Sequence, residues 1–227
     1  MLKHIFKRYI IEKFSVNFLE RALSVSNLGN NYAEVRNLKS YQRREDLWGA
    51  TFKMLEDTSI TLLEFGVYKG YSIKFFSNLN SHKASTFYGF DSFIGLPEDW
   101  SKNEPKGAFD TMGKLPETND ERVNFVKGWF QNTLPLFLSN NQISENVVVH
   151  FDADIYSATL FLMLELDKLK QPYVAIFDEF YGPENRALYN YCQMTSANVE
   201  FFGKVENGPY PAQVSCKISP SKNYSVT

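Results

Sequence analysis

From Ile60 onward the chain alternates short apolar runs with stretches of helical spacing, a pattern typical of a parallel sheet whose strands are joined by crossover helices. The last two apolar runs have no helix between them and predict an antiparallel hairpin at the sheet edge. Strands are expected near 60–65, 86–91, 123–127, 145–152 and 173–178, the hairpin at 198–204 and 211–218, and helices near 70–79, 132–139, 157–169 and 184–196. The predicted fold class is therefore α/β, with a doubly wound, mostly parallel, seven-stranded sheet.

The residues before this pattern carry helical periodicity. Bulky side chains recur every three to four positions over residues 2–26, and the cluster Gly29-Asn30-Asn31 is expected to end that helix. A second helix is expected from Ser40 to Asp57, with Ser40 as its N-cap. We interpret residues 1–58 as an extension of the domain formed by residues 59–227. It would serve as a lid or a dimer surface, or simply pack against the sheet.

Composition narrows the class of protein. The 227 residues suit one domain with a full core. With 24 basic and 26 acidic residues, the chain has no charge excess that would indicate nucleic acid or an anionic membrane as a partner. Cys192 and Cys216 form neither a disulfide framework nor a zinc motif, which favours a reduced, cytoplasmic setting. No run approaches the roughly 20 apolar residues of a membrane helix, and early basic residues interrupt any signal-peptide core.

A glycine turn follows the first predicted strand. In LLEFGVYKGYS, which starts at Leu62, Gly66 and Gly70 lie where the next helix opens, so the backbone can approach a ligand closely. Asp91 ends the second strand 25 residues after Gly66, a position from which a carboxylate can accept ribose hydroxyls. The spacing matches neither the dinucleotide fingerprint nor a P-loop. Together the two features predict a nucleoside cofactor.

Carboxylates gather at the ends of two later strands. In VVVHFDADIYSAT, Asp152 and Asp154 are two positions apart and point to the same side of a strand. The next strand ends in Asp178-Glu179, roughly 5 Å away if the two strands are neighbours. Such oxygen ligands suit magnesium first, with manganese or calcium as substitutes. His150 is interpreted as a hydrogen-bonded core residue rather than a ligand.

Five sequence blocks occur in the order seen in a known family, and the similarity covers roughly residues 60–195. The blocks are LEFGVYKGYS, GFDSFIGLPEDW, FVKGWFQNTLP, HFDADIYSAT and IFDEF. In this respect the chain resembles the macrocin-type sugar O-methyltransferases. These are class I enzymes that depend on S-adenosylmethionine, have a Rossmann-like sheet and are distantly similar to the catechol and caffeoyl-coenzyme A enzymes.

The resemblance implies a role for individual residues. For S-adenosyl-L-methionine it implies binding by Glu64, Gly66, Tyr68, Gly70, Ser72, Asp91, Ser92, Gly128 and Trp129. For Mg²⁺ or Mn²⁺ it implies the ligands Asp152, Asp178 and Glu179. The catechol-type enzymes place a basic lysine where this chain has Ile155, so Asp154 becomes the general base, with Asp152 as the other catalytic residue.

The implied reaction is metal-dependent methyl transfer to a hydroxyl of a sugar, in a glycosylated natural product, a nucleotide-linked sugar or a polysaccharide. The irregular stretch 93–121 would close over the site with Phe93, Leu96, Trp100 and Phe109. The expected partner is a small-molecule acceptor, with a homo-oligomer through the N-terminal helices as an open option. Two alternatives are a metal-dependent nucleotide-sugar glycosyltransferase, whose Asp-x-Asp site is similar, and a non-catalytic binding protein with the methyltransferase fold.

Overall fold

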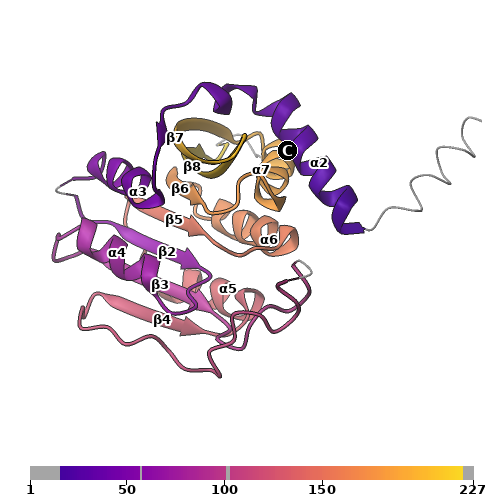
Figure 1. Cartoon of the computed structure of the whole chain (residues 1–227). Helices are drawn as coiled ribbons and strands as arrows, with labels where there is room; N and C mark the ends of the chain where they lie inside the picture. Colours follow the sequence, from indigo (N-terminus) through magenta and orange to yellow (C-terminus); the bar gives the residue numbers. More distant parts are fainter. Residues whose placement is uncertain (1–15, 57, 101–102, 222–227) are drawn as a thin grey trace, which may run out of the picture.

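The computed structural model describes residues 16–56, 58–100 and 103–221, which form a single sheet with helices on both faces (Figure 1). The strands are β1 (Ser40–Tyr41), β2 (Thr61–Phe65), β3 (Thr86–Asp91), β4 (Val123–Lys127), β5 (Val147–Phe151), β6 (Tyr173–Phe177), β7 (Asn198–Asn207) and β8 (Tyr210–Ser219). The helices are α2 (Val16–Asn31), the short 3-10 helix η1 (Ala33–Asn37), α3 (Arg44–Lys53), α4 (Tyr71–Leu79), α5 (Phe130–Asn140), α6 (Tyr156–Asp167) and α7 (Pro183–Thr195). The predicted alternation of strands and helices after residue 60 is confirmed.

The sheet has eight strands in the order β1-β7-β8-β6-β5-β2-β3-β4, so the prediction of seven strands is wrong. The additional strand is β1, in which Ser40 and Tyr41 pair with Lys204 and Val205 of β7. A two-residue strand has no periodicity of its own and cannot be detected in a sequence. Because β1 forms the edge of the sheet, the β7–β8 hairpin lies between β1 and β6 and not, as was predicted, at the edge. Among the described strands, β8 alone pairs antiparallel with both of its neighbours, β6 and β7.

The N-terminal helices differ from the prediction in their boundaries. The first predicted helix falls partly on residues outside the described chain, and its described part, α2, continues through the Gly29-Asn30-Asn31 cluster to Asn31. The second helix starts at Arg44 rather than Ser40, which belongs to β1. A strand-forming pairing with β7 therefore replaces the expected cap. The 3-10 helix η1 connects α2 to β1.

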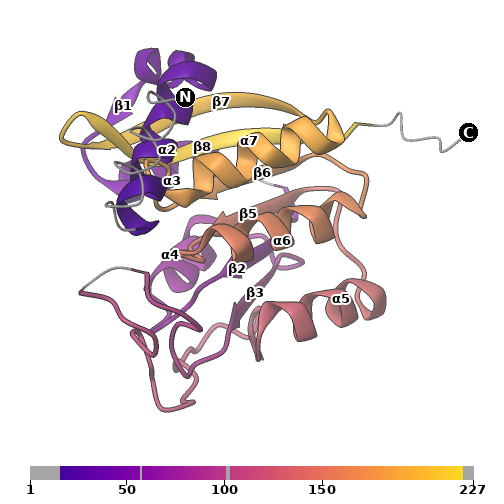
Figure 2. The same ribbon diagram turned by 90° about the vertical axis from the view of Figure 1, so that its right-hand side faces the viewer.

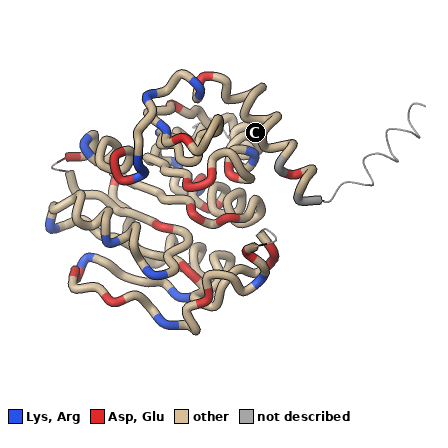
Figure 3. The backbone as a smooth tube through the Cα atoms, in the orientation of Figure 1, with Lys and Arg blue, Asp and Glu red and all other residues tan. Residues whose placement is uncertain are grey.

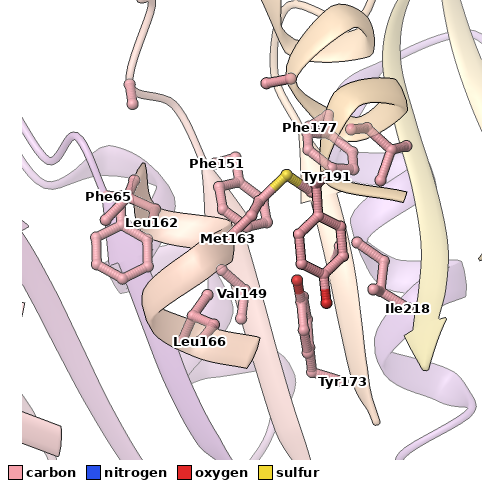
Figure 4. Close-up of a cluster of buried hydrophobic side chains, with 14 of the residues drawn as sticks. Phe65, Val149, Phe151, Leu162, Met163, Leu166, Tyr173, Phe177, Tyr191 and Ile218 are labelled. Atoms are coloured by element: carbon pink, nitrogen blue, oxygen red, sulfur yellow. The ribbon is translucent and has the colours of Figure 1, made fainter. Parts of the chain in front are cut away.

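Strand alternation divides the core into two layers. Helices α5, α6 and α7 cover one face of the sheet, and α3 and α4 cover the other (Figure 2). On the α6 face, Phe65, Phe151 and Phe177 occupy the same register position on β2, β5 and β6 and form a row of rings (Figure 4). Each is the last residue of its strand, so this buried row supports the strand ends from which the site extends.

The opposite layer centres on Trp48, which is fully buried against Phe76 and Phe52. The indole thereby ties α3 to α4 and to the sheet, and α3 is part of the domain core. Helix α2 packs on α7, where the Asn27 amide donates to Asn185 Oδ1 at 2.8 Å. Basic and acidic residues are interspersed along the tube (Figure 3). Within the described chain, no helix has the length and apolar character needed to cross a membrane.

Candidate functional site

A pocket of about 300 Å³ opens at the carboxyl ends of the parallel strands. This edge of the sheet is where open α/β folds bind ligands. Ten of the thirteen predicted site residues line it: Gly66, Tyr68, Asp91, Ser92, Gly128, Trp129, Asp152, Asp154, Asp178 and Glu179. The structure therefore brings together the glycine turn, the second-strand acid and the carboxylates, which lie far apart in the sequence.

The turn after β2 depends on Gly66. Its φ of +97° is unfavourable for residues with a side chain, and a Cβ atom there would lie 1.9 Å from the carbonyl oxygen of Asp152. The Gly66 N–H donates to Phe90 O at 3.0 Å. Gly66 thus lets β2 and the segment carrying Asp152 approach each other at the pocket floor.

Replacement of Gly66 by alanine is expected to destabilise the fold by about 3 kcal/mol or more, because left-handed strain adds to the overlap with Asp152. Thermal unfolding measures the loss. Gly49→Ala is the matched control, since a Cβ atom at Gly49 in α3 would meet nothing within 4 Å. The control is expected to unfold at the wild-type temperature or slightly above it. Equal behaviour of the two variants would contradict the close approach.

Asp91 organises the same turn through its carboxylate. Its Oδ2 accepts from the backbone N–H groups of Val67 (2.8 Å) and Tyr68 (2.9 Å), and its Oδ1 accepts from Phe93 N–H at 2.7 Å. Two bonds already use Oδ2, so Oδ1 is the oxygen with spare capacity for a ribose hydroxyl. The predicted ligand-binding role of Asp91 is accompanied by a structural one that the sequence did not indicate.

Three predicted cofactor residues lie outside the pocket lining. Glu64 is fully buried beneath it and accepts a bond from Ser72, and its Oε1 lies 3.0 Å from His150 Nδ1. Burial raises the pKa of Glu64, and the bond to His150 opposes this rise. Gly70 is the left-handed residue before α4, beside Pro116. For Glu64, Gly70 and Ser72, contact with the cofactor remains a prediction. In the structure they lie next to the residues that line the pocket, not in its wall.

The carboxylate cluster forms at the tips of β5 and β6. Ligand atoms of His150, Asp152 and Asp178 all lie within 4.8 Å of one another. Burial, followed by repulsion from Asp178 and Asp154, raises the pKa of Asp152 well above its usual range. Crowded carboxylates of this kind need protons or a cation. Glu179 is outside this group but lines the pocket, and its role as a ligand remains a prediction.

His150 lies closer to the cluster than the sequence reading implied. It is 1% exposed, and its Nε2 has no hydrogen-bond partner among the described residues. Its hydrogen bond with Glu64 agrees with the interpretation as a hydrogen-bonded core residue. Because its ring nitrogen lies close to the carboxylates of Asp152 and Asp178, His150 is nevertheless a candidate fourth metal ligand, in addition to the three predicted acids.

Asp154 has a strained backbone and an unusual charge environment. Its φ is +59°, a left-handed conformation that aspartate tolerates better than most residues. Burial, followed by repulsion from Glu179 and Asp178, raises its pKa from 3.8 to about 7. A carboxylate with a pKa near neutrality is suited to accept a proton at physiological pH.

A second pocket, of about 540 Å³, adjoins the first. Asp154, Ile155, Glu179 and Trp100 line both pockets, so Asp154 lies where the two meet. The walls of the second pocket come from α2, the lid, the start of α6, the start of α7 and the first residue of β8. Its aromatic residues are Trp100, Tyr156, Tyr181 and Tyr210.

The predicted lid is only partly as expected. Leu96, Trp100 and Phe109 line the first pocket. Phe93 does not, because its ring is fully buried against Phe125 in the core layer of α3 and α4. Its inclusion among the lid residues was wrong. Phe93 follows Asp91 closely, and the bond from its N–H to that carboxylate turns the chain back into the core before the lid begins.

Two buried polar residues were missed by the sequence reading. Glu184, in the first turn of α7, accepts from Glu179 N–H at 3.0 Å, and burial followed by repulsion from Asp178 raises its pKa. Its place after Gly182-Pro183, at a helix start, was a usable signal for a capping acid. Gln213 on β8 donates from Nε2 to Asp178 Oδ1. No signal in the sequence singled it out, because it alternates with apolar residues as a solvent-facing residue would.

Residues 63–179, just over half of the chain, match the model of a family described as a methyltransferase domain. The chain belongs to this methyltransferase family. Membership confirms the coarser part of the sequence prediction, a methyltransferase, and supports S-adenosylmethionine as the methyl donor. It overturns the glycosyltransferase alternative. No curated protein sequence matches the chain.

Solved methyltransferase structures share the fold at low sequence identity. The calicheamicin methyltransferase CalS11 has a TM-score of 0.56 at 18% identity, over 89% of this chain and 93% of that one. The O-methyltransferase NovP has a TM-score of 0.51 at 16% identity, over 88% and 98%. An O-methyltransferase from Bacillus cereus, solved in complex with SAH, has a TM-score of 0.53 at 10% identity, over 96% and 100%. These similarities support the Rossmann-like methyltransferase fold.

Proposed function

We propose that this methyltransferase is an O-methyltransferase that transfers the methyl group of S-adenosylmethionine to a sugar hydroxyl with the help of a divalent cation. The observation that carries the proposal is the position of Asp154. It lies where two pockets meet, beside the carboxylates of Asp152 and Asp178, and has a pKa of about 7. The first pocket, next to the glycine turn, would take the cofactor, and the second would take the acceptor.

The residues present fit a divalent cation. Asp152 and Asp178 bring carboxylate oxygens within 4.8 Å of each other. The raised pKa of Asp152 comes first from burial and then from repulsion by Asp178 and Asp154, which a cation would relieve. These two residues would hold the ion, with Glu179 or His150 as a further ligand. Oxygen-rich ligation favours magnesium or manganese. When bound, such an ion supplies positive charge that lowers the pKa of an acceptor hydroxyl.

The chain's own residues then have distinct tasks. Asp154 would receive the proton of the acceptor hydroxyl. S-Adenosylmethionine, when bound, would supply the methyl group, so that S-adenosylhomocysteine and the methyl ether would be the products. Gly66 and Asp91 hold the turn against which the cofactor lies. The lid residues Leu96 and Trp100 exclude water from the first pocket. Holding the two reactants in this geometry accounts for much of the expected acceleration.

A sugar acceptor is supported by the second pocket and by one of the structural neighbours, CalS11. Its aromatic residues offer flat apolar surfaces for a sugar ring, while Asp154 lies at its inner end. CalS11 is described as a TDP-rhamnose 3'-O-methyltransferase of calicheamicin biosynthesis, and NovP as an O-methyltransferase. The macrocin-type resemblance points to the same class of acceptor.

The proposal is tested by isothermal titration with S-adenosylmethionine, with and without magnesium, followed by labelled methyl transfer to nucleotide sugars, glycosides and phenols. Micromolar cofactor binding and a methylated sugar hydroxyl are expected. Methylation of phenols alone would contradict the sugar acceptor. Cofactor binding without transfer to any acceptor, in the presence of cation, would favour the non-catalytic alternative. Absence of cofactor binding would contradict the proposal as a whole.

Cation binding should be visible in the pH dependence of thermal stability. The pKa of Asp154 rises from 3.8 to about 7, so the folded protein keeps a proton that the unfolded chain has released in this range. Without cation, stability should therefore fall as the pH rises from about 4 to about 7. Magnesium at about 100 times its Kd should raise the Tm at pH 8 by on the order of 5 °C. At pH 5.5 the gain should be smaller, because protons compete for the carboxylates.

Thermal unfolding in chelator and in magnesium, at both pH values, measures this effect. Sodium at equal ionic strength separates specific binding from screening. A Tm gain from magnesium that is equal at pH 5.5 and pH 8 would contradict competition at the carboxylate cluster. No gain at either pH would contradict the cation site itself.

A further inference from the structure

A chain of hydrogen bonds links helix α3 to the carboxylate cluster. Trp48 Nε1 donates to Gln213 Oε1 at 3.0 Å, and Gln213 Nε2 donates to Asp178 Oδ1. Trp48 is fully buried and Gln213 is 4% exposed, so water does not compete at the centre of the chain. Neither Trp48 nor Gln213 lines the cofactor pocket. The link thus approaches Asp178 from behind the site.

The indole fixes which way the Gln213 amide faces. An indole N–H can only donate a hydrogen bond, so the amide atom that faces it must be the oxygen. The amide nitrogen is thereby directed at Asp178, where it can only donate. Asp178 Oδ1 is consequently held as an acceptor, and the rotation of its carboxylate is restricted.

This restraint acts where the carboxylates are most crowded. The charge of Asp178 contributes to the raised pKa of both Asp152 and Glu184. A carboxylate among such neighbours would turn away from them unless a hydrogen-bond donor held it in place. Partners of this kind orient metal ligands in other proteins, and their loss typically lowers metal affinity 10- to 100-fold.

We propose that Gln213, oriented by Trp48, is a positioning residue that presents the Asp178 carboxylate to the divalent cation. This inference rests on the proposed function, since it assumes a cation at the cluster. It also gives the N-terminal extension a part in the site, because α3 supplies the indole that fixes the amide. Neither residue touches the reacting atoms.

The test measures Mn²⁺ affinity by electron paramagnetic resonance, without acceptor or turnover. Gln213→Met keeps the length of the side chain and removes the amide donor, and is expected to raise the Mn²⁺ Kd about 10-fold. Trp48→Phe keeps a ring in the core but removes the N–H, so the amide can turn, and should raise the Kd about 3-fold or more. The double variant should bind no more weakly than Gln213→Met, because both changes break one chain.

Thr51→Val is the matched control. Thr51 lies on the same helix as Trp48, is 1% exposed and donates from its hydroxyl to Leu47 O at 2.8 Å. It should leave the Mn²⁺ Kd unchanged whatever its effect on Tm. S-Adenosylmethionine affinity should stay within about two-fold in every folded variant, because none of the three residues lines the pocket.

The outcomes separate this inference from the function on which it rests. If the wild-type protein binds no Mn²⁺, the metal part of the proposed function fails. If it binds Mn²⁺ and the Gln213 and Trp48 variants bind it equally well with a lowered Tm, the two residues are only structural and the inference is overturned. Should Gln213→Met not fold, Trp48→Phe alone decides between these results.

Discussion

Replacement of Asp152 by alanine is expected to lower kcat by at least about a thousand-fold, since a cation ligand contributes several kcal/mol to the transition state. The S-adenosylmethionine Kd should stay within a few-fold of the wild-type value, because the glycine turn is held by Gly66 and Asp91. Single-turnover methyl transfer measures the first quantity and isothermal titration the second. Mn²⁺ binding should be lost in parallel with the rate.

The variant must be distinguished from one that simply disturbs the turn. Asp152 donates from its backbone N–H to Phe65 O at 2.9 Å, a bond that alanine preserves. Glu200→Ala, on β7 away from both pockets, controls for loss of one negative charge. Activity at the wild-type level in Asp152→Ala would remove Asp152 from the proposed metal site.

Replacement of Asp154 by asparagine is expected to lower kcat by about 10²- to 10⁴-fold while Mn²⁺ and S-adenosylmethionine still bind. Asparagine matches the shape of aspartate and also tolerates left-handed backbone, so the φ of +59° is kept. Alanine would add strain at this position and confuse the result. The wild-type rate should rise as Asp154 loses its proton and then level off, and this titration should be absent from the variant.

A pH–rate profile from pH 5.5 to 9 measures this difference. With its base removed, the variant depends on hydroxide, and its rate should keep rising over the range in which the wild-type rate is level. If Asp154→Asn transfers methyl groups normally across neutral pH, another group accepts the proton. Glu179, which lines both pockets, would then be the next residue to test.

The central sheet could be predicted because its signals are local. Each of the strands β2 to β6 is a short apolar run, and each ends where a functional residue or turn begins. The convergence of Asp152 and Asp178 followed from the parallel pairing of β5 and β6, which the crossover helices imply. The fold class and most of the residues that line the pocket could therefore be predicted from the order and spacing of residues in the sequence.

Features that depend on distant contacts were not predictable in this way. The strand β1 exists only through its pairing with β7, and the sequence therefore suggested a helix cap at Ser40. On β8, Gln213 alternates with apolar residues as if it faced solvent, yet α3 covers that face and buries it. The burial of Phe93 likewise depends on the turn formed with Asp91. In each case the deciding partner lies on another element.

Strand β8 belongs to the folded sheet but lies outside the family signature, the segment that matches the family model. The signature ends at residue 179, but β6 borders β8, which is made from residues 210–219. A fragment cut at the signature boundary would expose the backbone donors and acceptors of β6 as an open edge, prone to aggregation. The pairing of β6 on this side is therefore complete only once residues 210–219 have been made. Chimeras that transplant this catalytic segment should extend to Ser219.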